Sequence, residues 1–487
     1  MIVLGVNDSS HDASVTLVDD GSVIFAGHSE RYNKEKNTFS LSSKLISEAL
    51  SYAQPDQIAY FENRTKKRLR RFIHGGINGA YEHLYSKKFS SLSSLPEIQF
   101  SHHESHAYAG FLTSPFETAA IVVSDAIGEF ETTSIWIGSD SGVRKVYSLK
   151  YPTSLGLFYS AFTRLVNLVP ARDEYILMGM AAYGSSERFY PLVNSLFPSL
   201  DDQKINFHLG VEHLFESQET FEWKASIAAA VQRVFTERTF ELHQLAQSLT
   251  GKKDVVYMGG CALNCSTNTQ LLNLWDEMWI MPNPGDAGSS MGAALATTRS
   301  RCENFSPYLG HEIKGDYPVE ASLKELLSKG VTGIASGRAE FGPRALGNRS
   351  LLADPRPQDT KSFVNQIKNR EPFRPFAPVI LEEYSTEWFD MDRPSPYMQF
   401  TFKCKKPLLV PSVVHEDGTS RVQTVNQTQH PGLYSLLKAW NDQTGVPLLL
   451  NTSLNVKNQP LVNDEEDVKS WLSENPDFSI HTAERTR

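Results

Sequence analysis

Apolar and polar residues follow a pattern that occurs twice in the first 150 residues. Apolar runs at residues 2–6 and 13–18 flank a polar loop, and an Asp-Gly turn at 19–22 leads into a third strand. Asp-Gly between alternating apolar runs is a strong hairpin signal. The same order returns at residues 120–149, where the polar loop 124–128 contains Asp125. The pattern therefore predicts a duplicated unit of strand, loop and hairpin.

Two such units, each followed by helical segments, are typical of an α/β fold of the actin-like or sugar-kinase-like ATPase type. In that architecture two related lobes bind a nucleotide between them, and the loop after each first strand faces the cleft. Two unrelated hairpins are the alternative. Further along, apolar residues spaced as on one helix face predict a core helix at 225–245, and residues 255–258 predict a buried strand.

That buried strand ends at Gly259-Gly260, and glycines at a strand-to-helix junction let a phosphate or ribose approach the backbone closely. The periodicity lapses beyond residue 300. We therefore predict an actin-like domain at 1–300, a linker at 301–320 and a second α/β domain at 321–487.

Composition narrows the class of protein. The chain has 487 residues, of which 40% are hydrophobic, so it can bury more than one core. A net charge of -9 argues against non-specific coating of nucleic acid. Four cysteines without zinc-ribbon spacing favour a reducing compartment. Because neither a signal peptide nor a long apolar stretch is evident, we expect a cytoplasmic protein that does not engage membranes.

A metal site is predicted from four residues. His102 and His106 are four positions apart, so on a helix they face the same way. Asp125 and Asp286 lie in loops that lead into or out of regular elements. Two imidazoles and two carboxylates suit Fe(II), Mn(II) or Zn(II). A surface helix with spare histidines is the alternative, and the histidine at position 103 is too near His106 for a zinc-protease motif.

Two further groups of residues suggest chemistry. His11, in the first cleft loop, could accept the proton of an attacking hydroxyl, although a lone loop histidine often has no such role. Residues 337–350 are rich in Arg, Gly and Pro, and more cations follow at 368–374, which predicts an anion site rather than a solvated helix face. Polar clusters at 415–423 and 451–455 follow or flank apolar runs and are expected to line a site.

The order of these motifs, from the first strand to about residue 462, resembles the O-carbamoyltransferase family of nodulation-factor and antibiotic-tailoring enzymes. The resemblance implies an N-terminal domain similar to the tRNA threonylcarbamoyladenosine-forming transferase and a C-terminal YrdC-like domain that makes an acyl-adenylate. It further implies that carbamoyl phosphate and Mg-ATP give carbamoyl-adenylate in the second domain. The carbamoyl group then passes, beside an Fe(II), Mn(II) or Zn(II) site, to a hydroxyl of a small-molecule or nucleotide acceptor.

The resemblance assigns roles residue by residue. His11 and Lys36 would be catalytic, and His102, His106, Asp125 and Asp286 would bind the metal. Gly259, Gly260 and Asn264 would bind nucleotide in the N-terminal site. Carbamoyl phosphate and ATP would be bound in the C-terminal site by a larger set, comprising Arg338, Arg344, Arg349, Lys368, Arg370, Arg374, Arg421, Asn451, Ser453 and Asn455.

Two departures and two alternatives accompany this hypothesis. Ile176 stands where relatives usually carry Lys, and the chain is shorter than the family between Asp125 and Asp286, which could alter the acceptor pocket. A tRNA threonylcarbamoyl-type transferase is one alternative, because the basic run at residues 64–71 could meet nucleic acid, although such runs are more often solvated. An actin-like ATPase without group transfer is the other. Homo-oligomerisation is left open.

Overall fold

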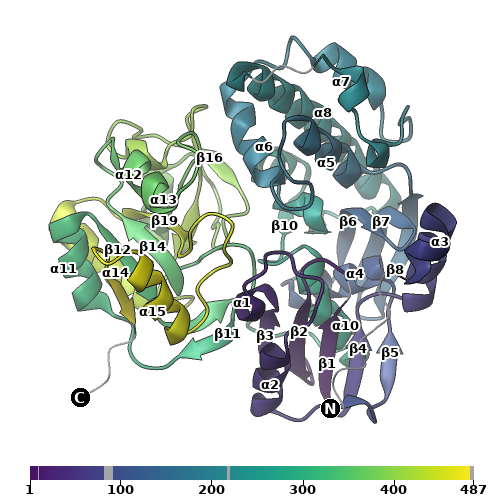
Figure 1. Ribbon diagram of the computed structural model, residues 1–487, viewed down its shortest axis with the longest axis horizontal. Coiled ribbons are helices and arrows are strands. Elements are labelled where there is room, and N and C mark those ends of the chain that lie inside the picture. The colour runs from purple at the N-terminus through teal and green to yellow at the C-terminus, as the bar shows by residue number, and fades with distance from the viewer. Residues whose placement is uncertain (9, 82–91, 217–219, 483–487) are drawn as a thin grey trace. The chain divides into compact units, whose positions relative to one another are not determined.

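The computed structural model describes residues 1–8, 10–81, 92–216 and 220–482. It divides into unit 1, formed by Met1–Glu30 and Asn37–Phe305, and unit 2, formed by Arg31–Lys36 and Ser306–Arg487. Both units mix helices with sheets (Figure 1), which confirms the predicted α/β class. The short segment Arg31–Lys36 belongs to unit 2 although its neighbours in the chain belong to unit 1.

The first sheet of unit 1 has the strand order β3-β2-β1-β4-β5. Its first strand pairs antiparallel with the second and parallel with the fourth, and β4 pairs parallel with β5. The apolar runs predicted as the first two strands are buried almost throughout in β1 and β2. The bounds are β1 (Ile2–Asn7), β2 (Ser14–Asp19), β3 (Ser22–His28), β4 (Gln57–Tyr60) and β5 (Glu97–Gln99).

The second sheet of unit 1 has the order β10-β9-β6-β7-β8 and repeats the topology of the first. Its leading strand again pairs antiparallel with the next strand and parallel with the strand that follows the long helical insertion. The duplication predicted from the sequence is therefore confirmed. The bounds are β6 (Ala119–Gly128), β7 (Glu131–Ser139), β8 (Gly142–Lys150), β9 (Asp254–Met258) and β10 (Glu277–Trp279).

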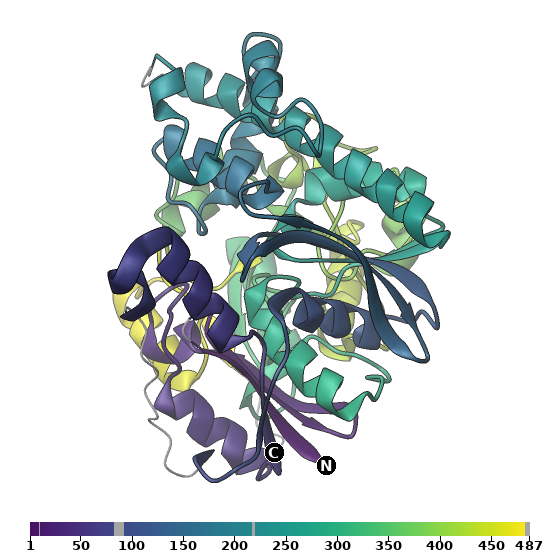
Figure 2. The same ribbon diagram turned by 90° about the vertical axis from the view of Figure 1, so that its right-hand side faces the viewer.

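Helices α4 (His102–Thr113) and α10 (Ser289–Thr298) lie between these sheets (Figures 1 and 2). Helix α10 packs on β1 and β2, α4 packs on β6 and β9, and the helices pack on each other. Small residues make this close contact feasible. A Cβ atom at Gly292 would lie 1.8 Å from the backbone oxygen of Ser105, and one at Gly5 would lie 1.8 Å from that of Ser290.

The predicted core helix is confirmed as part of α8 (Phe221–Thr250). The Thr220 side chain accepts a hydrogen bond from the Trp223 N–H at its start, and Gly251 ends it in the left-handed conformation. Helix α8 packs against the other helices inserted between β8 and β9, namely α5 (Leu155–Leu165), α6 (Glu174–Met180) and α7 (Tyr190–Leu196) (Figure 1). The remaining helices of unit 1 with at least seven residues in the described chain are α2 (Ser43–Tyr52), α3 (Arg64–Tyr81) and α9 (Cys265–Leu271).

Unit 2 is built on a sheet with the order β18-β15-β19-β14-β12-β20. Helices α11 (Val319–Lys329) and α14 (Pro431–Thr444) pack on each other and share a core with this sheet around the fully buried Trp440. The strands are β12 (Val331–Ala335), β14 (Arg349–Ala353), β15 (Ala377–Leu381), β18 (Gln423–Val425), β19 (Leu448–Ser453) and β20 (Ile480–Thr482).

Smaller elements complete unit 2. Strand β11 (Tyr308–Ile313) lies within the segment 301–320 for which the sequence predicts a linker, and it pairs with β13 (Gly337–Glu340) at the start of the arginine-rich motif. The others are α12 (Thr360–Ile367), α13 (Ser385–Trp388), β16 (Thr401–Lys403), β17 (Thr419–Arg421) and α15 (Glu465–Glu474). Within the described chain, every helix is too short or too polar to cross a membrane.

Candidate functional site

The predicted metal ligands come from separate elements of unit 1. His102 and His106 occupy the first turns of α4, Asp125 lies in β6, and Asp286 begins the short 3-10 helix η7 (Asp286–Gly288) that leads into α10. Glu104 stabilises the start of α4, because its Oε2 accepts a hydrogen bond from the Ser101 backbone at 3.3 Å. The close packing of α4 against α10 therefore brings residues far apart in sequence together.

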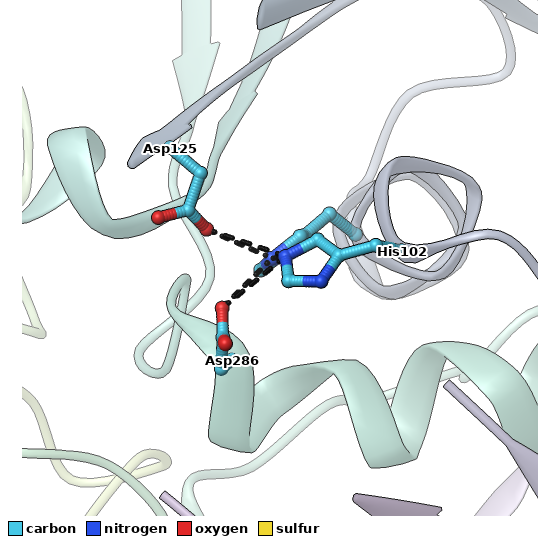
Figure 3. A group of neighbouring side chains, drawn as sticks. His102, Asp125 and Asp286 are labelled. Carbon is cyan, nitrogen blue, oxygen red and sulfur yellow. Dashed lines mark hydrogen bonds and ion pairs between the residues drawn. The ribbon is translucent and has the colours of Figure 1, made fainter. Parts of the chain in front are cut away.

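Their ligand atoms converge (Figure 3). His102 Nε2 lies 3.3 Å from Asp286 Oδ1 and 3.6 Å from Asp125 Oδ2. His106 Nε2 lies 3.2 Å from Asp125 Oδ2 and 3.4 Å from Asp286 Oδ1. One ligand atom from each residue lies within 4.8 Å of all the others. Ligands bound to a single ion at ~2.1 Å lie at most about 4.2 Å apart, so small adjustments bring these atoms around one ion.

The electrostatics of the cluster also fit a cation. Burial alone would lower the pKa of His102, but the charge of Asp286 and hydrogen bonds to carboxylates outweigh it and raise the pKa. Burial would likewise raise the pKa of Asp286, but the charge of His102 lowers it. Asp125 Oδ2 is buried and faces His106 Nε2 at 3.2 Å. A divalent ion would neutralise the carboxylates and satisfy this oxygen.

His11 joins the same cluster. Its Nδ1 lies 2.9 Å from Asp12 Oδ2, and its Nε2 lies 3.5 Å from Asp286 Oδ2. Asp12 has a left-handed backbone, with φ of 63°, and its Oδ1 accepts a hydrogen bond from Asn37 Nδ2 at 2.8 Å. Burial lowers the pKa of His11, but the charge of Asp286 and the contact with Asp12 raise it to about 10. The imidazole is therefore held beside the cluster.

Local packing explains why glycines follow β9. Gly259 has φ of 91°, and a Cβ there would lie 2.1 Å from the Ser124 backbone oxygen, so only glycine lets this turn approach β6. A Cβ at Gly260 would lie 3.1 Å from Asp125 Oδ1. The Asn264 side chain caps α9 by accepting from the Thr267 N–H at 3.1 Å. These contacts place the turn against Asp125.

In unit 2, Lys368 gathers several predicted residues. Its Nζ donates to the backbone and side-chain oxygens of Ser453 and, at 2.9 and 2.8 Å, to the backbone oxygen and Oδ1 of Asn455. The side chain is buried. Burial and the charges of Arg370, Arg374 and Lys36 hold its pKa well below the usual value. The charge of Lys36 therefore acts on Lys368, which belongs to the same unit.

Other predicted residues of unit 2 hold the local fold. Arg370 Nε donates to Asn365 Oδ1 at 2.5 Å, and its guanidinium lies over the Phe376 ring. Arg374 Nη1 lies 3.4 Å from Glu371 Oε2. These contacts orient two guanidinium groups whose charges reach Lys368.

The remaining predicted residues vary in their surroundings. Arg349 is fully buried and donates to backbone oxygens. Arg338 donates to the backbone oxygens of strand β11, and Asn451 Nδ2 donates to Gln423 Oε1 at 2.7 Å. Arg421 lies at the end of β17, and burial, together with the charge of Arg421, lowers the pKa of His415 to about 4. Arg344 is half-buried in the loop between β13 and β14.

Comparison with known proteins identifies the family. Residues 59–295 match the family model described as carbamoyltransferase N-terminus, and residues 323–479 match carbamoyltransferase C-terminus. Nodulation protein NolNO of Sinorhizobium fredii is 31% identical, with 95% of this chain and 76% of that protein covered. The chain belongs to the carbamoyltransferase family. It is therefore an enzyme that transfers a carbamoyl group.

Further relatives extend the comparison. Nodulation protein NolO of Bradyrhizobium diazoefficiens is 32% identical to this carbamoyltransferase, and the match covers 75% of each chain. Among solved structures, full-length HypF in its phosphate- and nucleotide-bound form is 15% identical, with a TM-score of 0.34 and coverage of 61% of this chain and 55% of that chain.

Sequence reasoning missed Asn7 and gave Arg31 no role of its own beyond the opening motif of the family. Asn7, the buried last residue of β1, donates through Nδ2 to the backbone oxygens of Asp12 at 3.0 Å and Asp286 at 3.2 Å. Arg31 is buried and donates to the backbone oxygens of Glu340 and, at 2.8 Å, Gly342. A polar residue ending an apolar strand is a sequence signal for the first. Ile176, the family departure, is buried in α6.

Proposed function

We propose that this enzyme is an ATP-dependent O-carbamoyltransferase that uses its two units for successive half-reactions. Unit 2 would activate carbamoyl phosphate as carbamoyl-adenylate, and unit 1 would transfer the carbamoyl group to a hydroxyl of a small-molecule or nucleotide acceptor. The family match supports carbamoyl transfer in general. The observation that carries the finer proposal is the buried ammonium of Lys368, which lies near other cations.

The reactants of the activation step are anions. Carbamoyl phosphate would first be hydrolysed to carbamate and phosphate, and a carbamate oxygen would then attack the α-phosphorus of Mg-ATP, releasing pyrophosphate. Lys36, Lys368, Arg370 and Arg374 supply positive charge for the phosphate oxygens of substrate and leaving group. Because burial and neighbouring cations lower the pKa of Lys368, a bound phosphate would stabilise its charged form.

Transfer is a hydroxyl attack on an activated carbonyl. The acceptor oxygen would bond to the carbamoyl carbon, the bond from that carbon to the AMP oxygen would break, and AMP would leave. His11 would take the hydroxyl proton at Nε2, which lies 3.5 Å from Asp286 Oδ2 beside the cluster. A divalent ion held by His102, His106, Asp125 and Asp286 would supply positive charge to phosphate or carbonyl oxygens. Neutralising Asp286 would also lower the pKa of His11 toward the range of a base.

The first experiment measures AMP and pyrophosphate formed from ATP, with and without carbamoyl phosphate, using full-length protein supplied with Fe(II) and Mg(II). We expect AMP only when carbamoyl phosphate is present. ADP as the sole product, or no dependence on carbamoyl phosphate, would contradict the activation step and favour an actin-like ATPase.

Two variants separate the half-reactions. Lys368→Met should abolish carbamoyl-phosphate-dependent AMP formation, because it removes the buried ammonium that faces the oxygens of Ser453 and Asn455. His106→Ala should leave AMP formation intact and abolish transfer to an acceptor. If both variants lose AMP formation equally, the assignment of one half-reaction to each unit is wrong.

A further inference from the structure

A buried ion pair lies directly behind the proposed metal site. Glu62 follows strand β4, and Lys67 lies in the first turn of α3, within the basic run at residues 64–71. Lys67 Nζ donates to Glu62 Oε1, and both side chains are 6% exposed. One lysine of that run is thus paired inside unit 1. The side chain of Arg71 lies outside the described residues.

The other oxygen of Glu62 faces a metal ligand. Glu62 Oε2 lies 3.7 Å from His102 Nδ1, while His102 Nε2 faces the carboxylates of the cluster. Figure 3 shows that these two nitrogens lie on different sides of the imidazole ring. His102 Nδ1 is buried and makes no hydrogen bond to any described residue. If Nε2 binds a cation, Nδ1 must carry the proton, and Glu62 is the carboxylate that faces this N–H group as a hydrogen-bond acceptor.

The imidazole has little freedom to turn elsewhere. A Cβ atom at Gly128 would lie 2.5 Å from the His102 ring, so β6 packs against one side of it. The Phe61 ring lies with its centroid 5.1 Å from that of His102. The second histidine has a different neighbour, because His106 Nδ1 lies 3.2 Å from the Ser289 hydroxyl. One ligand is therefore backed by a carboxylate and the other by a neutral hydroxyl.

We propose that Glu62 is a positioning residue for the metal site, which fixes His102 with Nδ1 protonated and Nε2 free to bind the ion, and that Lys67 holds Glu62 in place. The pair is neutral overall, so it orients and polarises the ligand without changing the net charge of the site. A carboxylate behind a ligating histidine typically changes metal affinity 10- to 100-fold when it is removed. This inference rests on the metal site of the proposed function.

The test uses Co(II) alone as the probe, titrated into metal-stripped full-length protein and followed by its visible absorption. Glu62→Gln/Lys67→Met removes both charges at nearly constant volume, so no buried charge is left unpaired. We expect a 10- to 100-fold rise in the Kd for Co(II) and an altered absorption band. Lys67→Met alone keeps the carboxylate but removes the group that holds it, so it should weaken Co(II) binding by less than the double variant does.

Unit 2 provides a matched control. Glu325 also contacts a lysine and a histidine, with Lys329 Nζ at 2.9 Å and His481 Nε2 at 2.6 Å, although the Lys329 side chain is 53% exposed. Glu325→Gln/Lys329→Met should therefore leave the Kd for Co(II) within twofold of wild type. This control variant shows how much Co(II) binding changes when a carboxylate that contacts a lysine and a histidine is lost away from the proposed metal site.

The outcomes separate this inference from the proposed function. The role of Glu62 is overturned if wild type and Glu62→Gln/Lys67→Met have the same Co(II) affinity and the same spectrum. It is also overturned if Lys67→Met alone loses as much Co(II) affinity as the double variant. If wild type shows no Co(II) binding that is lost in His106→Ala, the proposed metal site does not exist. The transfer half of the proposed function is then overturned as well.

Discussion

Replacing Arg349 with methionine tests whether this arginine holds unit 2 together or binds substrate. Arg349 begins β14 and is fully buried. Its guanidinium donates to five backbone oxygens from four places in the chain, namely those of Asn463 at 3.0 Å, Ser336 at 3.0 Å, Gly337 at 3.2 Å, Asn348 at 2.8 Å and His311 at 2.9 Å.

The magnitude follows from these bonds. Arg349→Met would leave the carbonyl oxygens without their charged donor in a place that water does not reach, and each such loss costs roughly 1–3 kcal/mol. Removing the buried cation recovers part of this cost, because burial already lowers the pKa of Arg349 to about 10. We therefore expect a net destabilisation of unit 2 by about 3–5 kcal/mol, or roughly 10 °C in its unfolding temperature.

The assay is scanning calorimetry with urea unfolding of full-length protein. Arg338→Met is the matched control, since Arg338 is half-buried and donates to the backbone oxygens of Leu309 and Gly310, so its loss should cost about 1 kcal/mol or less. At a temperature where Arg349→Met is still folded, its KM for carbamoyl phosphate should stay within a few-fold of wild type. A stable variant with a KM raised tenfold or more would refute the structural role.

Three further outcomes are expected. Lys368→Met should raise the KM for carbamoyl phosphate in the AMP assay at least tenfold, whereas Lys438→Met, on the exposed side of α14, should not change it. Removing the metal ion with a chelator should lower the unfolding temperature of unit 1. If the free ion is at 100 times its Kd before chelation, the loss of stability should be about 2.7 kcal/mol, and His106→Ala should show no such loss. Burial lowers the pKa of His430 to about 4, so the unfolded chain takes up a proton below pH ~6.5 that the folded chain does not. Stability should therefore fall as pH drops from about 6.5 to 4, by up to ~3 kcal/mol, and His430→Gln should flatten this part of the urea-unfolding profile.

Local patterns in the sequence determined much of the fold. The duplicated hairpins of unit 1 and the core of α8 follow from alternation and helical spacing, because each depends on residues only a few positions apart. The spacing of His102 and His106 likewise places both imidazoles on one helix face. The sequence also marked Asp125 and Asp286 as candidate ligands, although Asp125 lies within strand β6 rather than in the predicted loop.

Tertiary structure decided the relations between distant segments. That Asp125 and Asp286 meet depends on the packing of α4 against α10 between the sheets, and no periodicity encodes it. Within unit 2, the charge of Lys36 acts on Lys368, which lies far from it in the chain.

Charged residues were the hardest to interpret from sequence alone. Arg349 and Arg374 look alike in an arginine-rich stretch. Arg349, however, donates its hydrogen bonds to backbone oxygens, whereas the charge of Arg374 contributes to the electrostatic potential around Lys368. Lys67 looks like part of a solvated basic run, yet it is buried against Glu62. The physical reason is that a cation's role depends on the groups around it, and long-range packing brings those groups together.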